Sequence, residues 1–527
     1  MARKLVLLSC ACAVRLADAA TFTVLNTDDS GVGSLREAIT LANADNTTPR
    51  MINFSAAGTI TLTSALPQVT KFMTIDATTA PGYAGTPVVT IDGNSGDFDG
   101  LTVNAFFTGN ANNKTFVKGL CIINCGMNGG TARNGITLVD GDSVTVSGCF
   151  IGINAAGTAA ARNTAAGIRC ELAVATIGGT GTNDRCVISG NLGAGIDGQT
   201  DGSNQGSPIT VLNSYIGLGA NGMTAVPNGG DGIRAVPSVS AAALTVGSTV
   251  AGSGNFISAN GGAGIRTQRS ATIKRNTIGL GVDGTTARGN TQDGIVIAAS
   301  ASVIGFGAGD GNVVSANGGD GVRVSSPSTS RSTIRDNFIG TDSTGMLDRG
   351  NGMYGVEILG GGATGGAALG LNVISGNTLF GVRVASGDGN ISTSKIGLNT
   401  AATAAIPNQG GGVWVDNAVT LTITSCTISG NAGPGVKVSG ASADAITLTG
   451  NAIGLNGPGG GVDLGNTGHG IEISGGAEHA VIGSANLDSN INEIRFNGGN
   501  GINADSCNRI LFNKIFGNES DAFGGGG

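Results

Sequence analysis

The sequence predicts an all-β fold: a single-stranded, right-handed parallel β-helix, or solenoid, with a short capping helix at its N-terminus. Three observations carry this prediction. A motif of Asn, three residues, Gly and then Ile or Val recurs about every 30 residues. The residues after each such glycine alternate between apolar and polar, as in a strand with one buried face. The 527 residues include 95 glycines but one tryptophan and three tyrosines, which argues against aromatic globular cores.

The repeat motif occurs twelve times, and its copies fall into two alternating classes. One class carries Ile-Ser-Gly-Asn or a close variant, and the other follows an Ile-Gly pair, so the larger unit is about 60 residues. Gly135-Ile136 is a thirteenth strand start that lacks the Asn. We expect each repeat to form one turn of a coil, with equivalent strands stacked about 4.8 Å apart around an Ile, Val and Leu interior. The repeat asparagines are Asn163, Asn191, Asn228, Asn260, Asn290, Asn317, Asn351, Asn377, Asn408, Asn431, Asn466 and Asn497.

The recurring Asn and Gly have a structural explanation that needs no ligand. Asn tolerates left-handed backbone angles, and its amide both donates and accepts, so stacked asparagines are predicted to bond along the coil as a ladder. Gly permits the tight corner before each strand.

The first residues have the pattern of a secretory signal peptide. Arg3 and Lys4 precede an apolar run over residues 5–14, and Ala17-Asp18-Ala19 fits a small-x-small cleavage site. An alternative is a lipoprotein signal at Leu8-Ser9-Cys10, although the apolar stretch before that cysteine is short. We therefore expect an exported protein, secreted or at the cell surface. No later segment is apolar for long enough to span a bilayer, so an integral membrane protein is not expected.

The rest of the chain divides by pattern into three parts. Residues 20–133 are predicted to hold the N-terminal cap and the first rungs, residues 134–517 the β-helix repeats, and residues 518–527 a Gly-rich tail. Ser34-Leu35-Arg36-Glu37 has the spacing of a helix capping box, and the apolar residues after it lie on one face of a short helix. We expect this helix to cover the open edge of the first rung.

Charge and cysteine content exclude several classes of function. Removal of residues 1–19 leaves 25 basic and 34 acidic side chains, which argues against a nucleic-acid partner or an anionic membrane surface. Seven cysteines remain, at positions 121, 125, 149, 170, 186, 426 and 507, without a Cys-x-x-Cys spacing. Buried free cysteines are the favoured interpretation. A disulfide between Cys121 and Cys125, or between neighbouring rungs, is the alternative in an exported protein.

The N-terminal part resembles a known family. Gly33-Ser34-Leu35-Arg36-Glu37-Ala38-Ile39 stands where bacterial right-handed β-helix repeat proteins carry a Cys-Ser-Leu-Arg-Glu-Ala signature, with Gly33 in place of the Cys. The resemblance continues through Ile52-Asn53-Phe54, Thr74-Ile75-Asp76 and the later repeats. It implies a fold of the pectin-lyase-like kind and a bacterial, exported location. Many such proteins have no assigned activity.

Polysaccharide lyases and glycoside hydrolases also use this fold, but the chain lacks their clear signatures. Gly468-His469-Gly470 matches a Gly-His-Gly element of polygalacturonases, yet Gly470 is a strand-opening glycine of the repeat. Asp-Asp occurs only at Asp28-Asp29, outside the repeats, and the other acidic residues are scattered. The Gly-rich stretches lack the Asp of calcium-binding nonapeptides. No metal and no cofactor are therefore expected.

The outward residue of each repeat strand forms the candidate ligand-binding strip. If the register holds, these residues stand in one line along the coil. In chain order the line is Arg234, Arg266, Val296, Arg323, Glu357, Arg383, Trp414, Lys437 and Glu472. The plain interpretation is a solvated ladder in which Glu357 lies between Arg323 and Arg383. The alternative is a strip that binds an acidic glycan, with Trp414 as a stacking platform. The candidate binding residues are Arg266, Arg323, Arg383, Trp414 and Lys437.

These patterns favour an exported, non-catalytic β-helix that acts as a surface scaffold, adhesin or glycan-contacting module, and that is a monomer. Its expected partners are polysaccharides or cell-surface components. The alternative is a lyase or hydrolase acting on an acidic polysaccharide. An enzyme would need at least two carboxylates, or Arg or Lys beside clustered acids, converging on one sheet face together with aromatic subsites.

Overall fold

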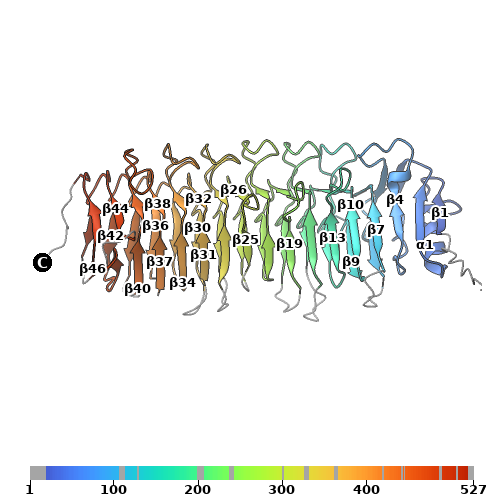
Figure 1. The fold of residues 1–527 in the computed structure, drawn as a ribbon. Helices are drawn as coiled ribbons and strands as arrows, with labels where there is room; N and C mark the ends of the chain where they lie inside the picture. The colour runs from blue at the N-terminus through green and yellow to red at the C-terminus, as the bar shows by residue number, and fades with distance from the viewer. Residues whose placement is uncertain are drawn as a thin grey trace, which may run out of the picture.

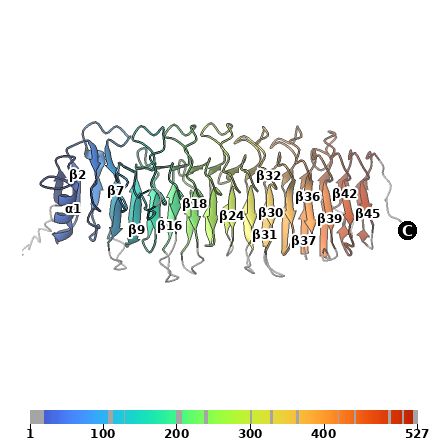
Figure 2. The same cartoon turned by 180° about the vertical axis from the view of Figure 1, so that it is seen from behind.

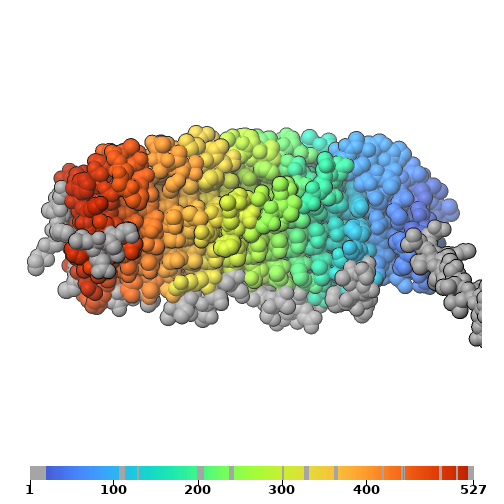
Figure 3. Space-filling view, viewed as in Figure 1, coloured from blue at the N-terminus to red at the C-terminus, as the bar shows by residue number. Residues whose placement is uncertain are grey.

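The computed structural model is an elongated rod with its termini at opposite ends (Figures 1 and 3). It describes residues 19–105, 113–127, 130–198, 207–236, 242–298, 302–325, 331–360, 366–417, 420–440, 443, 445–485, 490–505 and 508–519. The chain winds through three long parallel sheets, here named A, B and C. From β4 onward it visits them in that order on each turn, and the first strand of sheet C is β6. The prediction of a right-handed parallel β-helix is confirmed. The proposed signal peptide and most of the Gly-rich tail lie outside the described residues.

Sheet A contains 17 strands in the described part of the chain. They are β1 (Ala20–Val24), β2 (Arg50–Phe54), β4 (Thr74–Asp76), β7 (Thr115–Lys118), β10 (Val144–Ser147), β13 (Ala175–Gly178), β16 (Ile209–Leu212), β19 (Leu244–Val246), β22 (Ala271–Ile273), β25 (Val303–Gly305), β28 (Ser332–Arg335), β31 (Gly366–Gly370), β34 (Asp388–Ser392), β37 (Thr420–Thr424), β40 (Ala445–Thr449), β43 (Val481–Ile482) and β46 (Arg509–Ile510).

Sheet B contains 16 described strands, which at about 4.8 Å per rung give a rod of roughly 70 Å. They are β3 (Gly58–Thr61), β5 (Val89–Asp92), β8 (Leu120–Ile123), β11 (Phe150–Ile151), β14 (Val187–Ile188), β17 (Tyr215–Ile216), β20 (Phe256–Ile257), β23 (Thr277–Ile278), β26 (Val313–Val314), β29 (Phe338–Ile339), β32 (Val373–Ile374), β35 (Lys395–Ile396), β38 (Thr427–Ile428), β41 (Ala452–Ile453), β44 (Asn492–Ile494) and β47 (Asn513–Ile515).

Sheet C is formed by the strands that the Gly-Ile/Val motif predicts, preceded by β6 (Leu101–Asn104), and several of them are labelled in order along the rod in Figure 2. The others are β9 (Ile136–Asp140), β12 (Ile168–Cys170), β15 (Ile196–Asp197), β18 (Ile233–Ala235), β21 (Ile265–Thr267), β24 (Ile295–Ile297), β27 (Val322–Val324), β30 (Val356–Ile358), β33 (Phe380–Val384), β36 (Gly411–Asp416), β39 (Val436–Ser439), β42 (Ile471–Ser474) and β45 (Ile502–Ala504).

A short helix covers the first rung, as the sequence predicts. Helix α1 (Leu35–Ala44) buries Leu35, Ala38, Ile39 and Ala42 and packs against β1 and β2. Ser34 caps it by accepting a hydrogen bond from the Glu37 backbone N–H at 3.2 Å. The Glu37 carboxylate accepts from the Gly33 N–H rather than from that of Ser34, because the Ser34 N–H already donates to the Gly31 carbonyl. A single turn of 3₁₀ helix, η1 (Ala77–Thr79), follows β4.

The predicted asparagine ladder lines the turn between sheets B and C. Each amide donates to the side-chain oxygen of the asparagine on the next rung, at 2.8 to 3.0 Å, from Asn163 to Asn518. The same amides also donate to backbone carbonyls of the preceding rung. From Asn163 to Asn497 these polar side chains are almost fully buried, so the ladder satisfies groups that water cannot reach.

A second asparagine ladder, which was not predicted, lies at the turn between sheets A and B. Asn255, Asn276, Asn312, Asn337 and Asn372 are linked rung to rung by amide hydrogen bonds of 2.9 to 3.1 Å. Near the C-terminus, Asn451, Asn492 and Asn513 continue the same pattern.

The cysteines of the described chain are free thiols inside the rod. Cys121, Cys125, Cys149, Cys170, Cys186 and Cys426 are all buried, and no disulfide joins any of these six. Burial raises the pKa of Cys186 to about 11 and that of Cys426 to about 12, so both are neutral thiols. The structure therefore has buried free cysteines and not the alternative disulfides. Cys507 lies outside the described residues.

Candidate functional site

The outward residues of sheet C stand in one continuous line, as the repeat predicts. The strand register pairs each of them with the next, rung by rung. All five candidate binding residues belong to this line. In chain order it reads Arg169, Asp197, Arg234, Arg266, Val296, Arg323, Glu357, Arg383, Trp414, Lys437 and Glu472.

Most cations of the line are paired with carboxylates. Glu357 lies between Arg323, at 3.6 Å, and Arg383, at 2.7 Å. Arg383 also contacts Asp416 at 2.7 Å, and Lys437 contacts Glu472 at 3.1 Å. The solvated-ladder interpretation therefore describes the part of the line from Arg323 to Glu472. Arg383 is paired with carboxylates and is not a free cation.

Trp414 is a half-buried member of an aromatic group. Its Nε1 donates to the Ser439 hydroxyl at 2.8 Å, and its ring lies 5.5 Å from that of Phe380. The Arg383 guanidinium lies 5.0 Å from the Trp414 ring and 5.4 Å from that of Tyr354. These contacts fix the orientation of the indole, because its N–H is hydrogen-bonded to Ser439 and its ring packs against Phe380 and Arg383.

Two buried carboxyl groups share this region. The Asp320 carboxyl is hydrogen-bonded to that of Glu357, which requires a proton between them, and it also accepts from the Tyr354 N–H at 3.0 Å. Burial, followed by the charge of Glu357, raises the pKa of Asp320 to about 7. Asp320 is 1 % exposed and Glu357 5 %, so the pair has almost no surface that a substrate could reach.

The N-terminal half of the same face is hollowed into a groove of about 480 Å³. It crosses six successive rungs, from the turn before β9 to the turn before β24, which corresponds to roughly 24 Å along the rod. The residues that line it are Asn134, Ala165, Ala166, Arg169, Gly193, Ala194, Asp197, Gly229, Gly230, Asp231, Arg234, Gly261, Gly262, Arg266 and Gln292.

The groove exists largely because several turns before these strands place glycine or alanine on its floor. A Cβ at Gly229 or Gly261 would lie 2.3 to 2.5 Å from a backbone oxygen of the preceding rung, so these glycines are required for stacking. On the later rungs, the equivalent turn positions hold Met353, Tyr354 and Leu379. These larger side chains occupy the space that the glycines and alanines leave open.

Arginines and carboxylates alternate along the groove. Arg169 contacts Glu171 at 2.8 Å, Arg234 contacts Asp197 at 3.8 Å, and Arg266 contacts Asp231 at 3.0 Å. A second nitrogen of Arg266 donates to Gln292 at 2.8 Å. The three guanidinium side chains remain 31 to 40 % exposed, so each has donors available to a ligand.

Asp197 is an acid of the groove with a perturbed pKa. Burial raises its pKa, against the lowering effect of Arg234, and one of its oxygens is buried without a hydrogen-bond partner. Asp231 lies near enough to raise it further, and Asp231 itself accepts from the Ala263 N–H at 2.7 Å. Two interacting carboxyls with different surroundings therefore occur in the groove.

The structure brings only one of the predicted site residues, Arg266, into the groove. Arg323, Arg383, Trp414 and Lys437 lie farther along the same line. Arg169 and Asp197 were not predicted, although both follow a Gly-Ile pair of the repeat, and Arg234 was predicted to stand in the line but not to bind a ligand. Extending the line toward the N-terminus would have identified them.

Two other expectations concern His469 and metals. The His469 Nδ1 accepts a hydrogen bond from the Asn500 N–H at 2.9 Å, which gives this turn residue a structural contact. Within the described ranges, no group of three or more His, Cys, Asp or Glu is arranged to hold a metal ion. No described helix has the length and apolar character that a membrane span requires.

Comparisons with known proteins add no family assignment. No known family and no curated protein matches the sequence. The chain is similar to the A-module of Azotobacter vinelandii mannuronan C-5 epimerase AlgE4, at 15 % identity and a TM-score of 0.31, over 93 % of each chain. It is also similar to the A-module of AlgE6 from the same organism, at 15 % identity and a TM-score of 0.30, over 96 % of this chain and 98 % of that one.

Proposed function

We propose that this protein is an exported, non-catalytic β-helix that binds a polysaccharide along the outward face of sheet C. The groove carries this proposal, because a linear depression that crosses six rungs fits an extended chain better than a compact molecule. The exported location rests on the signal-like segment over residues 1–19 and on the family resemblance. A surface scaffold or adhesin, acting as a monomer, would use the groove as its contact site.

The side chains of the groove suit hydroxyl and carboxylate groups. Three half-exposed guanidiniums offer N–H donors, and Asp231 and Gln292 offer acceptors for sugar hydroxyls. Because each arginine has a carboxylate neighbour, the groove is not a strongly positive strip. We therefore expect binding to depend on matched hydrogen bonds as well as on charge, and to fall only partly in high salt.

A glycan panel tests this function. The double substitution Arg234→Ala and Arg266→Ala should weaken binding of any captured polysaccharide about a hundredfold, from two lost charge-assisted contacts of about 1.4 kcal/mol each. Ala165→Trp should block the groove without removing a charge. Arg509→Ala, on the exposed end of sheet A, is the matched control and should leave the affinity unchanged. Binding that survives both groove variants would contradict the proposal.

A second candidate function is a lyase or hydrolase, and the Asp197 and Asp231 pair favours it. The raised pKa of Asp197 suits a general acid, and the Asp231 carboxylate lies 3.0 Å from the Arg266 guanidinium. Against it, the groove lining contains no aromatic side chain for a sugar subsite. The buried Asp320 and Glu357 pair is closed to substrate.

Turnover assays separate the two functions. We expect no unsaturated products and no new reducing ends when the protein is incubated with acidic polysaccharides. If products form, Asp197→Asn should lower the rate at least about a hundredfold, as loss of a general acid does. Asp505→Asn, on the last rung of sheet C, is the control. Turnover that Asp197→Asn abolishes would establish the enzyme and overturn the non-catalytic proposal.

A further inference from the structure

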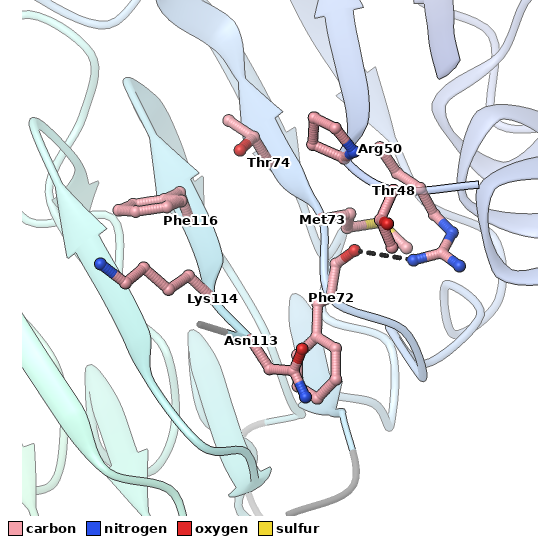
Figure 4. Close-up of a pocket in the computed structure, with 9 residues that line it drawn as sticks. Thr48, Arg50, Phe72, Met73, Thr74, Asn113, Lys114 and Phe116 are labelled. Carbon is pink, nitrogen blue, oxygen red and sulfur yellow. Dashed lines mark hydrogen bonds between the residues drawn. The ribbon is translucent and has the colours of Figure 1, made fainter. Parts of the chain in front are cut away.

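A second cavity lies on the outward face of sheet A, near the N-terminal end of the rod (Figure 4). Its volume is about 430 Å³. Thr74 lies on β4 between walls formed by Pro49, Phe72 and Phe116, and the close-up shows Phe72 and Phe116 on neighbouring segments. Apolar walls of this kind favour an apolar ligand part.

The cavity has a local cause in the sequence. The outward line of sheet A reads Met51, Thr74 and Phe116, and its next two members are Thr145 and Thr176. The aromatic side chain that forms a wall is therefore followed on the next two rungs by short threonines. This part of the face can hold a ligand where those two later rungs cannot.

Two cations line the cavity, and neither forms an ion pair with any described residue. Arg50 is 4 % exposed, and it donates to the carbonyls of Asp45, at 3.0 Å, and Phe72, at 3.2 Å. The Asp45 carboxylate is bonded instead to Thr47. Lys114 is exposed at the rim of the cavity. The Asp45 carboxylate lies near enough to feel the charge of Arg50 but forms no ion pair with it, and the two cations Arg50 and Lys114 together favour an anion in the cavity.

We propose that this cavity binds a small organic anion, an apolar ring or chain that carries a single carboxylate or sulfonate group. The apolar part packs between Phe72, Phe116 and Pro49. The charged group lies against the Lys114 ammonium, within the field of Arg50. This site is separate from the groove on sheet C and does not depend on polysaccharide binding.

The fluorescent probe anilinonaphthalene sulfonate tests the site, because it combines aromatic rings with one sulfonate. Thr74→Phe should fill the cavity and abolish saturable binding of the probe. Thr145→Phe places the same side chain in the same line one rung beyond Phe116 and should leave binding intact, so it is the matched control. Lys114→Gln should weaken binding about tenfold, whereas Lys437→Gln on sheet C should not.

Competition defines the ligand class. Octanoate should displace the probe, while octanol and inorganic sulfate at the same concentration should not. Equal loss of binding in Thr74→Phe and Thr145→Phe, or no loss in either, would overturn the site. Displacement by octanol as effective as that by octanoate would overturn the anionic ligand class.

Discussion

Asn317→Ala is expected to lower the free energy of unfolding by about 3–5 kcal/mol, because it breaks the buried asparagine ladder in its middle. The Asn317 side-chain oxygen accepts from the Asn290 amide at 2.8 Å, and its own amide donates to Asn351 at 3.0 Å and to the Ile278 carbonyl at 3.2 Å. Alanine removes these three bonds from a buried ladder, and each partner keeps only one other: the Asn290 amide to Ile257, the Asn351 oxygen from the residue 317 N–H, and the Ile278 carbonyl from Ser315. Denaturant unfolding measures the loss, and hydrogen exchange should show it first in β24, β27 and β30.

The control is Asn221→Ala, in an exposed loop where the side chain bonds only to Met223 and Thr224 of its own turn. This change should cost less than about 1 kcal/mol, because water can replace the lost bonds. Local weakening is expected rather than complete unfolding, since a solenoid distributes its stability over neighbouring rungs. Equal stability losses in the two variants would show that the ladder contributes no more than a surface turn.

Asp320→Asn is expected to change how stability depends on pH. The pKa of Asp320 is raised to about 7 in the folded protein, chiefly by burial and then by the charge of Glu357, from 3.8 in the unfolded chain. Between these values the folded state binds the extra proton, so the free energy of unfolding falls as pH rises from about 4 to about 7. The total loss is at most about 4 kcal/mol.

Asparagine imitates the protonated acid. It can still accept from the Tyr354 N–H and donate to Glu357, whose carboxylate also contacts Arg323 and Arg383. The variant should therefore lose the downward slope and exceed the parent in stability above pH 7. Nearby Asp293, whose carboxylate accepts from the Asp320 N–H, is unchanged. Unfolding by urea at pH 4, 5.5, 7 and 8 measures the difference.

Asp283→Asn is the control, because the pKa of Asp283 is lowered in the folded protein whereas that of Asp320 is raised. Hydrogen bonds from Thr286 and Thr285 lower the pKa of the exposed Asp283 carboxyl, so its contribution is lost only as pH falls below about 4. This variant should keep the parent slope between pH 4 and 7. A parent protein whose stability is flat across that range would show that Asp320 and Glu357 do not share a proton.

The sequence predicted the strands of sheet C but not the short strands of sheet B. Each Gly-Ile or Gly-Val pair after a repeat Asn opens a strand of sheet C. These strands could be predicted because a glycine at the corner, a buried apolar residue and an outward residue recur in a fixed order. Strands such as β11 and β14 have two residues, too few to show alternation. The second asparagine ladder was missed for a related reason. Its members precede those short strands, as in Asn276-Thr277-Ile278-Gly279, where the Ile-Gly pair alone was noted.

The line of outward residues on sheet C, from Arg234 to Glu472, was determined by the sequence alone, because strand register follows from the repeat period. The groove and the partners of each charge were decided only by the tertiary structure. Pairs such as Arg266 with Asp231, or Asp320 with Glu357, join residues 35 and 37 positions apart on stacked rungs. Burial, shared protons and open space depend on how neighbouring side chains fill the surface, and a periodic pattern carries no such information.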